Sequence, residues 1–412
     1  MGQARYFIEP YDVLVLRGNK LFGEPGSYGE TVVPPWPSVA AGAFRSALLA
    51  ARGYDPAAFA RGEIAHDPEL GTPQRPGTFT VASFGLARRR ADDEGAIEAL
   101  HPVPADLAVH APDIGEAHAR RISPVVAANG IQSSTATSRL AVLAQPKRGK
   151  LAHGGWLNAD AWCEHLAGRD IDTQRHLIPS EELFAVENRI GISLDPRRRS
   201  AEDGALFTTQ AVALRKSQGT TGSCGGVGGR SNSARFDVGF LAEIDGVAED
   251  AMPDTLTLRF GGDGRAARAM KVAVDTGRHT DRDATHRAIA EAGRCRLILT
   301  SPGIFASGWL PTGASRETDG GMRFELHGVA GRLVCAVVPR AEVISGFDLA
   351  KRRPKPAQRV APSGSVYWLN DIQAPPEALR NLATRGLWSE PAENASRRAE
   401  GFNRFAFALW RG

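Results

Sequence analysis

Short segments rich in β-branched and aromatic residues recur along this chain and outnumber the segments with helical periodicity. Examples are RYFIEPYDVLVL at 5–16, FDVGFLAEI at 236–244 and FNRFAFALW at 402–410. The helical segments, such as VAAGAFRSALLAAR at 39–52 and PPEALRNLA at 375–383, lie between strand pairs. This alternation predicts an α+β protein whose helices pack against antiparallel sheets, as βαββαβ units do.

A glycine- and serine-rich tract, SQGTTGSCGGVGGRSNS at 217–233, interrupts this alternation near the middle of the chain. Such a composition does not support regular structure and is typical of a loop or linker. A chain of 412 residues is also long for a single core. The sequence therefore predicts an N-terminal ferredoxin-like domain with insertions at 1–218, a loop or linker at 219–233 and a C-terminal ferredoxin-like domain at 234–412.

Helix boundaries are predicted from capping residues. Ser38 precedes the first apolar periodic segment and is the expected N-cap, with Gly53 as the stop. Asn158 is the expected cap of a helix over 157–166. A further short helix is expected from Ser180, so that ENRIGISLD at 187–195 begins at a helix end and turns into a strand.

The composition excludes several classes of protein. With 42% apolar and 23% charged residues, the chain fits a soluble globular protein. It has no apolar stretch long enough for a transmembrane helix, and its first residues lack the layout of a signal peptide. The four cysteines form no CxxC pair, which argues against a zinc site or a disulfide framework. We expect a cytoplasmic protein without metal or other cofactor.

Motifs for catalysis are missing from the sequence. It contains no HExxH, GxSxG or GxxxxGK[ST] pattern, and none of its 10 histidines lies in the first 65 residues. The sequence therefore predicts no catalytic residue.

Two segments suggest contacts with phosphate. The run GGDGR at 261–265 follows a strand and forms either a hairpin turn, which is favoured, or a phosphate cradle. From 340 to 360 the chain carries six Lys or Arg residues against two acidic ones, and three prolines from Pro339 to Pro356 keep the segment extended. An extended basic segment can follow a phosphate backbone, although a solvated surface loop is an equal alternative.

The last loop of the chain surrounds Gly401, Phe402 and Asn403. Glycine lets the backbone approach a ligand closely, and Phe402 or Trp388 is placed to stack on a base. The alternative is a loop that only joins a helix to the final strand.

An ordered series of motifs then resembles a known family. The motifs are RGNKLFG at 17–23, PPWPSVAAGAFRSALL at 34–49, ENRIGISLD at 187–195, ALFTTQ at 205–210, SPGIFASGWLP at 301–311, ISGFDLAKRRPKP at 344–356, APSGSVYWL at 361–369 and EGFNRFAFALW at 400–410. In this order they resemble the repeat-associated RAMP proteins of CRISPR systems. The nearest match is the third-subunit (Cmr-three) family of the type III-B Cmr effector module.

The resemblance implies two ferredoxin-like, RRM-like RAMP domains in tandem, with inserted hairpins and loops. It implies a non-catalytic subunit that binds the 5′ repeat-derived tag of the CRISPR RNA. Its implied partners are the large polymerase-palm (Cas-ten type) subunit and the backbone RAMP subunits. Two alternatives are a RAMP endoribonuclease that processes precursor CRISPR RNA and the equivalent subunit of a type III-A complex.

The resemblance also implies candidate RNA contacts, at positions that match the family motifs. They are Arg17, Asn19, Lys20, Ser38, Arg45, Asn188, Arg189, Lys351, Arg353, Lys355, Gly401, Phe402 and Asn403. Where the family usually has another glycine, this chain has Asn403, which tolerates a left-handed backbone better than most residues.

Overall fold

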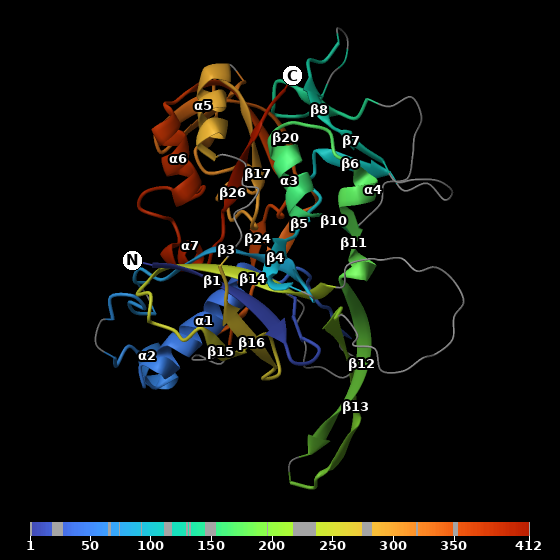
Figure 1. The fold of residues 1–412 in the computed structure, drawn as a ribbon, viewed down its shortest axis with the longest axis vertical. Helices are drawn as coiled ribbons and strands as arrows, with labels where there is room; N and C mark the ends of the chain where they lie inside the picture. Colours follow the sequence, from blue (N-terminus) through green and yellow to red (C-terminus); the bar gives the residue numbers. More distant parts are fainter. Residues whose placement is uncertain are drawn as a thin grey trace.

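Two six-stranded antiparallel sheets organise the chain, with helices packed against them (Figure 1). The computed structural model describes residues 2–18, 28–64, 67–73, 75–91, 93–110, 118–128, 131, 133–144, 154–195, 197–216, 236–273, 282–318, 320–348 and 353–411. The predicted α+β class is therefore confirmed. In the part of the chain so described, no helix is long and apolar enough to cross a membrane.

The first sheet has the strand order β15-β16-β1-β14-β3-β4. These strands are β1 (Gly2–Pro10), β3 (Thr80–Arg90), β4 (Asp93–Ala99), β14 (Phe236–Val247), β15 (Thr255–Arg259) and β16 (Ala266–Lys271). Helix α1 (Pro37–Ala51) packs on one face, where Phe44 lies against Tyr6 with ring centroids 5.2 Å apart. Alternate residues of β1 and β14 therefore supply the core beneath the helix.

The predicted linker does not separate the two sheets. Strand β3 precedes residues 219–233 and β14 follows them, yet the two strands pair along their whole length, from Phe236 opposite Arg90 to Asp245 opposite Thr80. Strands β15 and β16 also belong to the first sheet. The boundary predicted at 219–233 is thus wrong as a division of the sheets, because the first sheet continues to residue 271.

Helix α1 begins earlier than predicted. Its N-cap is Trp36 and no side chain caps it, whereas Ser38 lies inside the first turn. Pro37 occupies the first position because its fixed φ suits a helix start and its missing N–H would have no partner there. At the other end the expected stop is confirmed, since Gly53 adopts a left-handed φ of 67°.

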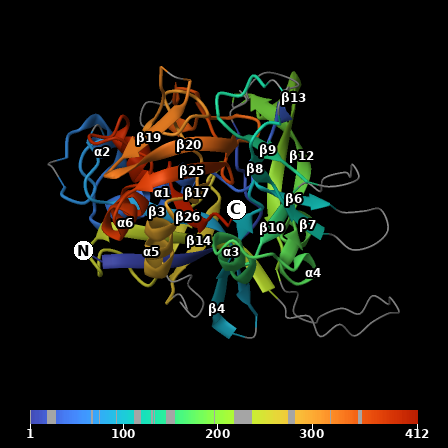
Figure 2. The same ribbon diagram turned by 90° about the horizontal axis from the view of Figure 1, so that it is seen from above.

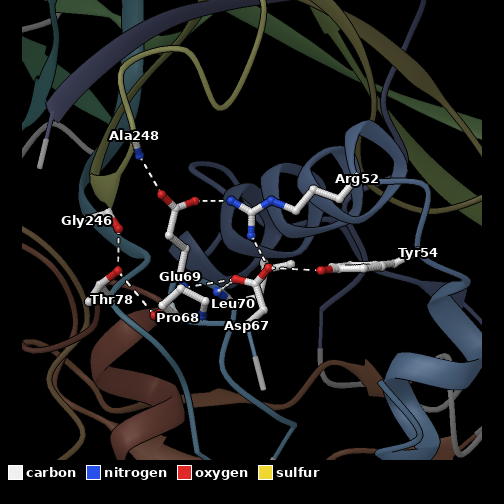
Figure 3. Close-up of polar contacts among 9 residues, drawn as sticks. All are labelled: Arg52, Tyr54, Asp67, Pro68, Glu69, Leu70, Thr78, Gly246 and Ala248. Carbon is white, nitrogen blue, oxygen red and sulfur yellow. Dashed lines mark hydrogen bonds and ion pairs between the residues drawn. The ribbon is translucent and has the colours of Figure 1, made fainter. Parts of the chain in front are cut away.

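Polar contacts fix the C-terminal end of α1 to the far end of the first sheet (Figure 3). The Arg52 guanidinium donates to the carboxylates of both Asp67 and Glu69. Glu69 in turn accepts a 2.7 Å hydrogen bond from the Ala248 amide, just beyond β14. Helix α2 (Pro56–Arg61) lies between α1 and this turn in the chain and is capped by Asp55. One arginine therefore connects the helix to the loop after β14.

The second sheet has the strand order β18-β19-β20-β25-β17-β26. Its strands are β17 (Cys295–Leu299), β18 (Ala314–Arg316), β19 (Met322–Leu326), β20 (Val329–Val337), β25 (Val366–Gln373) and β26 (Phe405–Leu409). Helices α5 (Arg282–Ala292) and α6 (Pro376–Arg385) cover one face through Ile289, Leu379 and Leu382. The helix predicted at 375–383 is confirmed as α6.

Residues 101–182 form small elements beside the second sheet. They are β5 (His101–Pro102), β6 (Leu107–His110), β7 (His118–Arg121), β8 (Ser123–Val125), β9 (Leu140–Val142), β10 (Gly155–Leu157), α3 (Ala159–Leu166), α4 (Thr173–His176), β11 (Leu177–Pro179) and the 3-10 turn η1 (Ser180–Glu182). Helix α3 packs on the other face of the second sheet through Leu166, against Trp368 and Trp410. Its predicted cap is confirmed, since Asn158 Oδ1 accepts a 2.9 Å hydrogen bond from the Ala161 amide.

A buried ionic network attaches this region to the second sheet. Asp106 accepts hydrogen bonds from Arg296 of β17 and from His165 of α3, the latter at 2.9 Å. All three side chains are at most 1% exposed. Burial alone would raise the pKa of Asp106, but His165 and Arg296 hold it well below its usual value. The aspartate is therefore an ionised internal partner of the arginine.

A long hairpin of β12 (Phe184–Asp195) and β13 (Ser200–Leu214) leaves the body of the molecule, where β2 (Tyr28–Gly29) pairs with β13 (Figure 1). Figure 2 shows it on the side opposite α6. The remaining elements are β21 (Glu342–Ile344), β22 (Phe347–Asp348), β23 (Arg353–Pro354), β24 (Gln358–Val360) and α7 (Ala395–Ala399). The expected helix from Ser180 is limited to η1, so ENRIGISLD lies within a strand.

Candidate nucleic-acid interface

A cavity of about 250 Å³ lies between the two sheets. Its wall includes Trp36 from the PPWPS segment, Ser301 from SPGIF, Ser363 from APSGS and Gly401 from EGFNRF. Strand β3 and Leu241 of β14 complete the side formed by the first sheet. Four motifs that are far apart in the sequence therefore meet at one place.

Polar donors lie at the wall of this cavity. The Arg404 amide donates to Ser301 Oγ at 2.9 Å, and its Nη1 donates to the Thr384 carbonyl at 2.7 Å. Burial lowers the pKa of Arg404, and the charge of Asp245 opposes that effect. Among the described residues, Arg404 Nε and Trp36 Nε1 are buried and have no hydrogen-bond partner. Both residues line the cavity, but these two N–H groups are themselves enclosed by the protein.

The turn at 401–403 is a structural junction. Gly401 has a φ of 93°, and a Cβ there would lie 2.7 Å from the Val81 carbonyl oxygen of the first sheet. Asn403 adopts the left-handed φ of 59° that its residue type tolerates. Its side chain accepts from the Ile304 amide at 2.6 Å and donates to the Leu387 carbonyl at 2.9 Å. The asparagine therefore connects three segments of the chain.

Phe402 and Trp388 are core residues. Phe402 is 0% exposed and Trp388 is 2% exposed, and both pack against Trp36, Ile344 and Val360. The expectation that either ring stacks on a base is wrong for this structure, because neither has an accessible face.

A buried cationic cluster lies next to this turn. Glu400 forms ion pairs with Lys355 at 3.1 Å and with Arg397 at 2.9 Å. Burial alone would raise the pKa of Glu400, but the charges of Lys355, Arg397 and Arg45 lower it. The Arg45 guanidinium lies over the Phe79 ring at 5.2 Å. Lys355 and Arg45, which the sequence placed on the RNA, thus meet around one internal carboxylate.

Exposed arginines follow the ribbon that leads away from this cluster. Strand β21 pairs with β24, and β22 pairs with β23, so that residues 342–348 and 353–360 run side by side as a two-stranded ribbon. Arg340, Arg353 and Arg359 are exposed. Lys351 lies outside the described residues. The basic segment is therefore a β-ribbon whose base is buried and whose far part presents cations.

The β12–β13 hairpin separates two of the predicted contacts. Asn188 pairs with Gln210 and Arg189 with Thr209. Because side chains alternate along a strand, Asn188 and Arg189 point to opposite faces. Arg189 forms a 3.3 Å ion pair with Glu187. The stretch ENRIGISLD therefore forms most of the exposed strand β12 and is not a turn.

The hairpin also carries apolar side chains that the sequence analysis did not single out. Five of them are exposed: Val186 by 45%, Ile190 by 78%, Ile192 by 45%, Leu194 by 61% and Leu206 by 55%. The alternation of apolar and polar residues in β12 was a visible signal, but it equally fits a half-buried strand. Only the structure shows that both faces of this hairpin lack a covering layer along much of its length.

Arg17 lies near the turn GGDGR. It forms a 2.8 Å ion pair with Asp263, and Arg265 forms one of 2.9 Å with Asp12. The turn joins β15 to β16 and has a left-handed φ at Gly261, Asp263 and Gly264, which confirms the hairpin interpretation. The neighbouring predicted contacts Asn19 and Lys20 lie outside the described residues.

The predicted contacts therefore fall into two groups. Arg45, Lys355 and 401–403 surround Glu400, with Arg353 further along the same ribbon. Arg17 and Arg189 lie near Asp12 and the turn after β15. Ser38, in the first turn of α1, follows the cavity-lining Trp36 and Pro37. Among the described residues, no group of three or more His, Cys, Asp or Glu side chains is arranged to hold a metal ion.

The chain is similar to solved structures of the Type III-B Cmr-beta complex. A search of curated proteins gave no match. Two solved structures are similar over 97% of this chain. One is "Cryo-EM structure of the Type III-B Cmr-beta bound to cognate target RNA", with 14% identity, 96% of that chain covered and a TM-score of 0.46. The other shows the same complex with target RNA and AMPPnP, with 13% identity, 95% of that chain covered and a TM-score of 0.44.

The family comparison covers nearly the whole chain. The model described as "CRISPR-associated protein (Cas_Cmr3)" matches residues 6–410. This span includes every motif that resembled the RAMP proteins. The chain belongs to the Cas_Cmr3 family of CRISPR-associated proteins, the third-subunit family of the type III-B Cmr effector module.

Proposed function

We propose that this chain is a non-catalytic RNA-binding subunit of a type III-B effector complex. It holds the 5′ repeat-derived tag of the CRISPR RNA and docks on the large polymerase-palm subunit, next to the backbone RAMP subunits. Family membership supports the effector complex as its setting. The basic ribbon at 342–360 is the observation that carries the RNA-binding role.

The ribbon suits a phosphate backbone for two reasons. Its exposed residues Arg353 and Arg359 form no ion pair with any residue that the structure describes. Its base is fixed, because Arg397 donates to the Ser345 carbonyl at 3.1 Å and to Gln358 Oε1 at 3.1 Å. Because this backbone is already ordered, little backbone entropy is lost when its cations bind an anion.

The two groups of predicted contacts then have different roles in the proposal. Arg17, Arg189 and Arg353 are exposed and are available to RNA. The positive charges of Arg45 and Lys355 stabilise the carboxylate of Glu400 at the base of the ribbon. The turn at 401–403 fixes the second sheet to the first. Asn188 lies on the same face of the hairpin as its exposed apolar residues.

We also propose that both sheets derive from ferredoxin-like units. The order β16-β1-β14-β3 in the first sheet is the 4-1-3-2 order of a βαββαβ unit. The order β26-β17-β25-β20 in the second sheet is the same. In the first, α1 occupies the crossover between strands one and two, and in the second, α6 occupies the crossover between strands three and four.

The hairpin supports docking on another subunit. Its exposed apolar residues lie on a segment that extends away from the body (Figure 1). Exposed apolar surface of this kind is typical of a protein interface. We assign the apolar face of the hairpin to contact with a neighbouring protein subunit and its basic tip at 197–199 to the RNA side.

The experiment measures binding of tag RNA to the purified chain over a series of salt concentrations. Replacing Arg353 and Arg359 together by Glu removes two phosphate contacts. The slope of log K against log salt is then expected to become shallower by about 1.4, at about 0.7 per contact on a single strand. Arg282→Glu combined with Arg316→Glu, at exposed arginines of α5 and β18, is the charge-matched control.

Two results would contradict the proposal. If both variants change the slope equally, the RNA follows net charge and not the ribbon. If the protein cleaves repeat RNA specifically without metal, the chain is a processing nuclease instead.

A further inference from the structure

An aromatic ring is exposed on the basic ribbon. Phe347 of β22 has 56% of its surface exposed, whereas phenylalanine is usually buried. It stands opposite Pro354 of β23. Tyr11 and Trp309 are also exposed, but Phe347 is the one that shares its ladder with Arg353. The ring and the cations therefore belong to the same ribbon.

The backbone just before Phe347 is fixed. Ser345 Oγ donates to the Lys355 carbonyl at 2.9 Å, and the Lys355 amide donates to the Gly346 carbonyl at 2.8 Å. The Lys355 side chain forms its ion pair with Glu400. Phe347 thus extends from a ribbon whose base is clamped to the core, so its ring is presented before any ligand arrives.

We propose that Phe347 stacks on an unpaired base of single-stranded RNA whose phosphates contact Arg353 and Arg359. This inference rests on the proposed RNA-binding function and adds the residue that receives a base. The rings that the sequence suggested for this role, Phe402 and Trp388, are buried. Phe347 stands opposite Pro354 and Arg353 stands opposite Asp348, so the ring and the Arg353 side chain point to opposite faces of a narrow ribbon. An exposed ring and exposed arginines on one ribbon combine the base stacking and the phosphate contacts that sequence-tolerant single-strand binders use.

A protein partner is the less favoured occupant of this surface. A docking patch is expected to be depleted of unpaired charge at its centre. Here the exposed residues on the strand that pairs with the Phe347 segment include Arg353 and Arg359, which have no ion-pair partner among the described residues. An exposed ring on a ribbon that also carries exposed arginines suits a ligand with planar bases and negative charges.

The test uses the full chain and a fluorescein-labelled octa-adenylate RNA. A set of eight further RNAs carries one abasic residue at each position in turn. For the intact RNA, Phe347→Ala is expected to weaken binding about 5- to 150-fold, the range for one base stacked on an aromatic residue. For the RNA that lacks the stacked base, the wild-type and variant chains are expected to bind equally.

Phe347→Trp and Phe347→Leu are the matched variants. Tryptophan keeps an aromatic face and should retain the affinity, whereas leucine keeps apolar bulk without the ring and should lose it. If leucine binds RNA as well as phenylalanine does, stacking is refuted. Because Phe347 is exposed, the urea midpoint of all three variants should match that of the wild type.

The outcomes also separate this inference from the proposed function. If Phe347→Ala leaves RNA affinity unchanged while the Arg353→Glu, Arg359→Glu variant loses it, the base contact is wrong and the RNA-binding function stands. If the wild-type chain binds neither this RNA nor tag RNA, the proposed function fails. If Phe347→Ala loses only its association with the large subunit, the ring serves a protein interface and the inference is overturned.

Discussion

Replacing Asp106 by Asn tests the buried ionic network most directly. Asp106 is 0% exposed and Arg296 is 1% exposed, so the variant leaves a guanidinium in the interior without its counter-charge. Breaking a buried pair in this way costs about 3–5 kcal/mol. That is a large part of a domain stability of about 5–15 kcal/mol. The free energy of unfolding, measured by urea titration, should fall by that amount.

The exposed pair Arg323 and Glu325 is the control. Their side chains are 55% and 60% exposed, and such pairs contribute less than about 1 kcal/mol. Glu325→Gln should therefore change the urea midpoint little. Adding Arg296→Met to Asp106→Asn should recover part of the loss, since the unpaired charge is then removed. A change for Asp106→Asn no larger than the control's would refute the role assigned to the network.

The same variant has a signature in pH. The pKa of Asp106 is depressed in the fold, so its stabilisation is present above the unfolded value of about 3.9 and is lost as pH falls below it. Burial also lowers the pKa of His165. Its stabilisation is therefore lost as pH falls below about 6.5, where the unfolded imidazole gains a proton. Asp106→Asn should flatten the stability curve below pH 4.

Three further predictions concern other parts of the molecule. Burial lowers the pKa of His101 to about 4, so stability falls with pH between about 6.5 and 4. His101→Phe keeps a ring against Trp162, 4.2 Å away in the wild type, and should make the urea midpoint less dependent on pH in that range. An unchanged pH dependence of the midpoint would exclude this. Gly401→Ala places a Cβ 2.7 Å from a backbone oxygen, whereas nothing lies within 4 Å of a Cβ at Gly308. In urea titrations, Gly401→Ala should lower the free energy of unfolding by about 1–3 kcal/mol more than Gly308→Ala does. Equal losses would contradict the close packing at Gly401. Ile190→Asp, at a side chain 78% exposed, should change the unfolding free energy by less than about 0.5 kcal/mol but reduce co-purification with the other effector subunits; intact assembly would remove the hairpin from the interface.

Features encoded within a few residues were predictable. Asn158 as a helix cap, the helical segment of α6, and the turn after β15 all depend on contacts local in the chain. The start of α1 shows the limit of this reasoning. Ser38 has the better capping side chain, but Pro37 fits the first helical position and moves the start back to Trp36.

Features that depend on distant pairing were not predictable. The alternation in β14 specifies one buried face but not which strands lie beside it, so the glycine-rich tract before it looked like a boundary. Burial of the candidate site had the same difficulty. Phe402 follows a glycine in a polar loop, and only Trp36 and Trp388 decide that its ring is enclosed. Lys355 looked like its neighbour Arg353 until Glu400 was found beside it.

The pairing of β1 has a consequence for how the chain is made. Ile8 of β1 lies between Phe240 of β14 and Ala269 of β16, so both neighbours of the first strand are synthesised long after it. At about 5–20 residues per second, this delay is on the order of 10–45 s. During that time β1 leaves the ribosome with both edges unpaired, which favours chaperone binding or aggregation. A fragment that ends before residue 236 lacks both neighbours of β1, so the N-terminal part of this protein folds only once more than half of the chain has been translated.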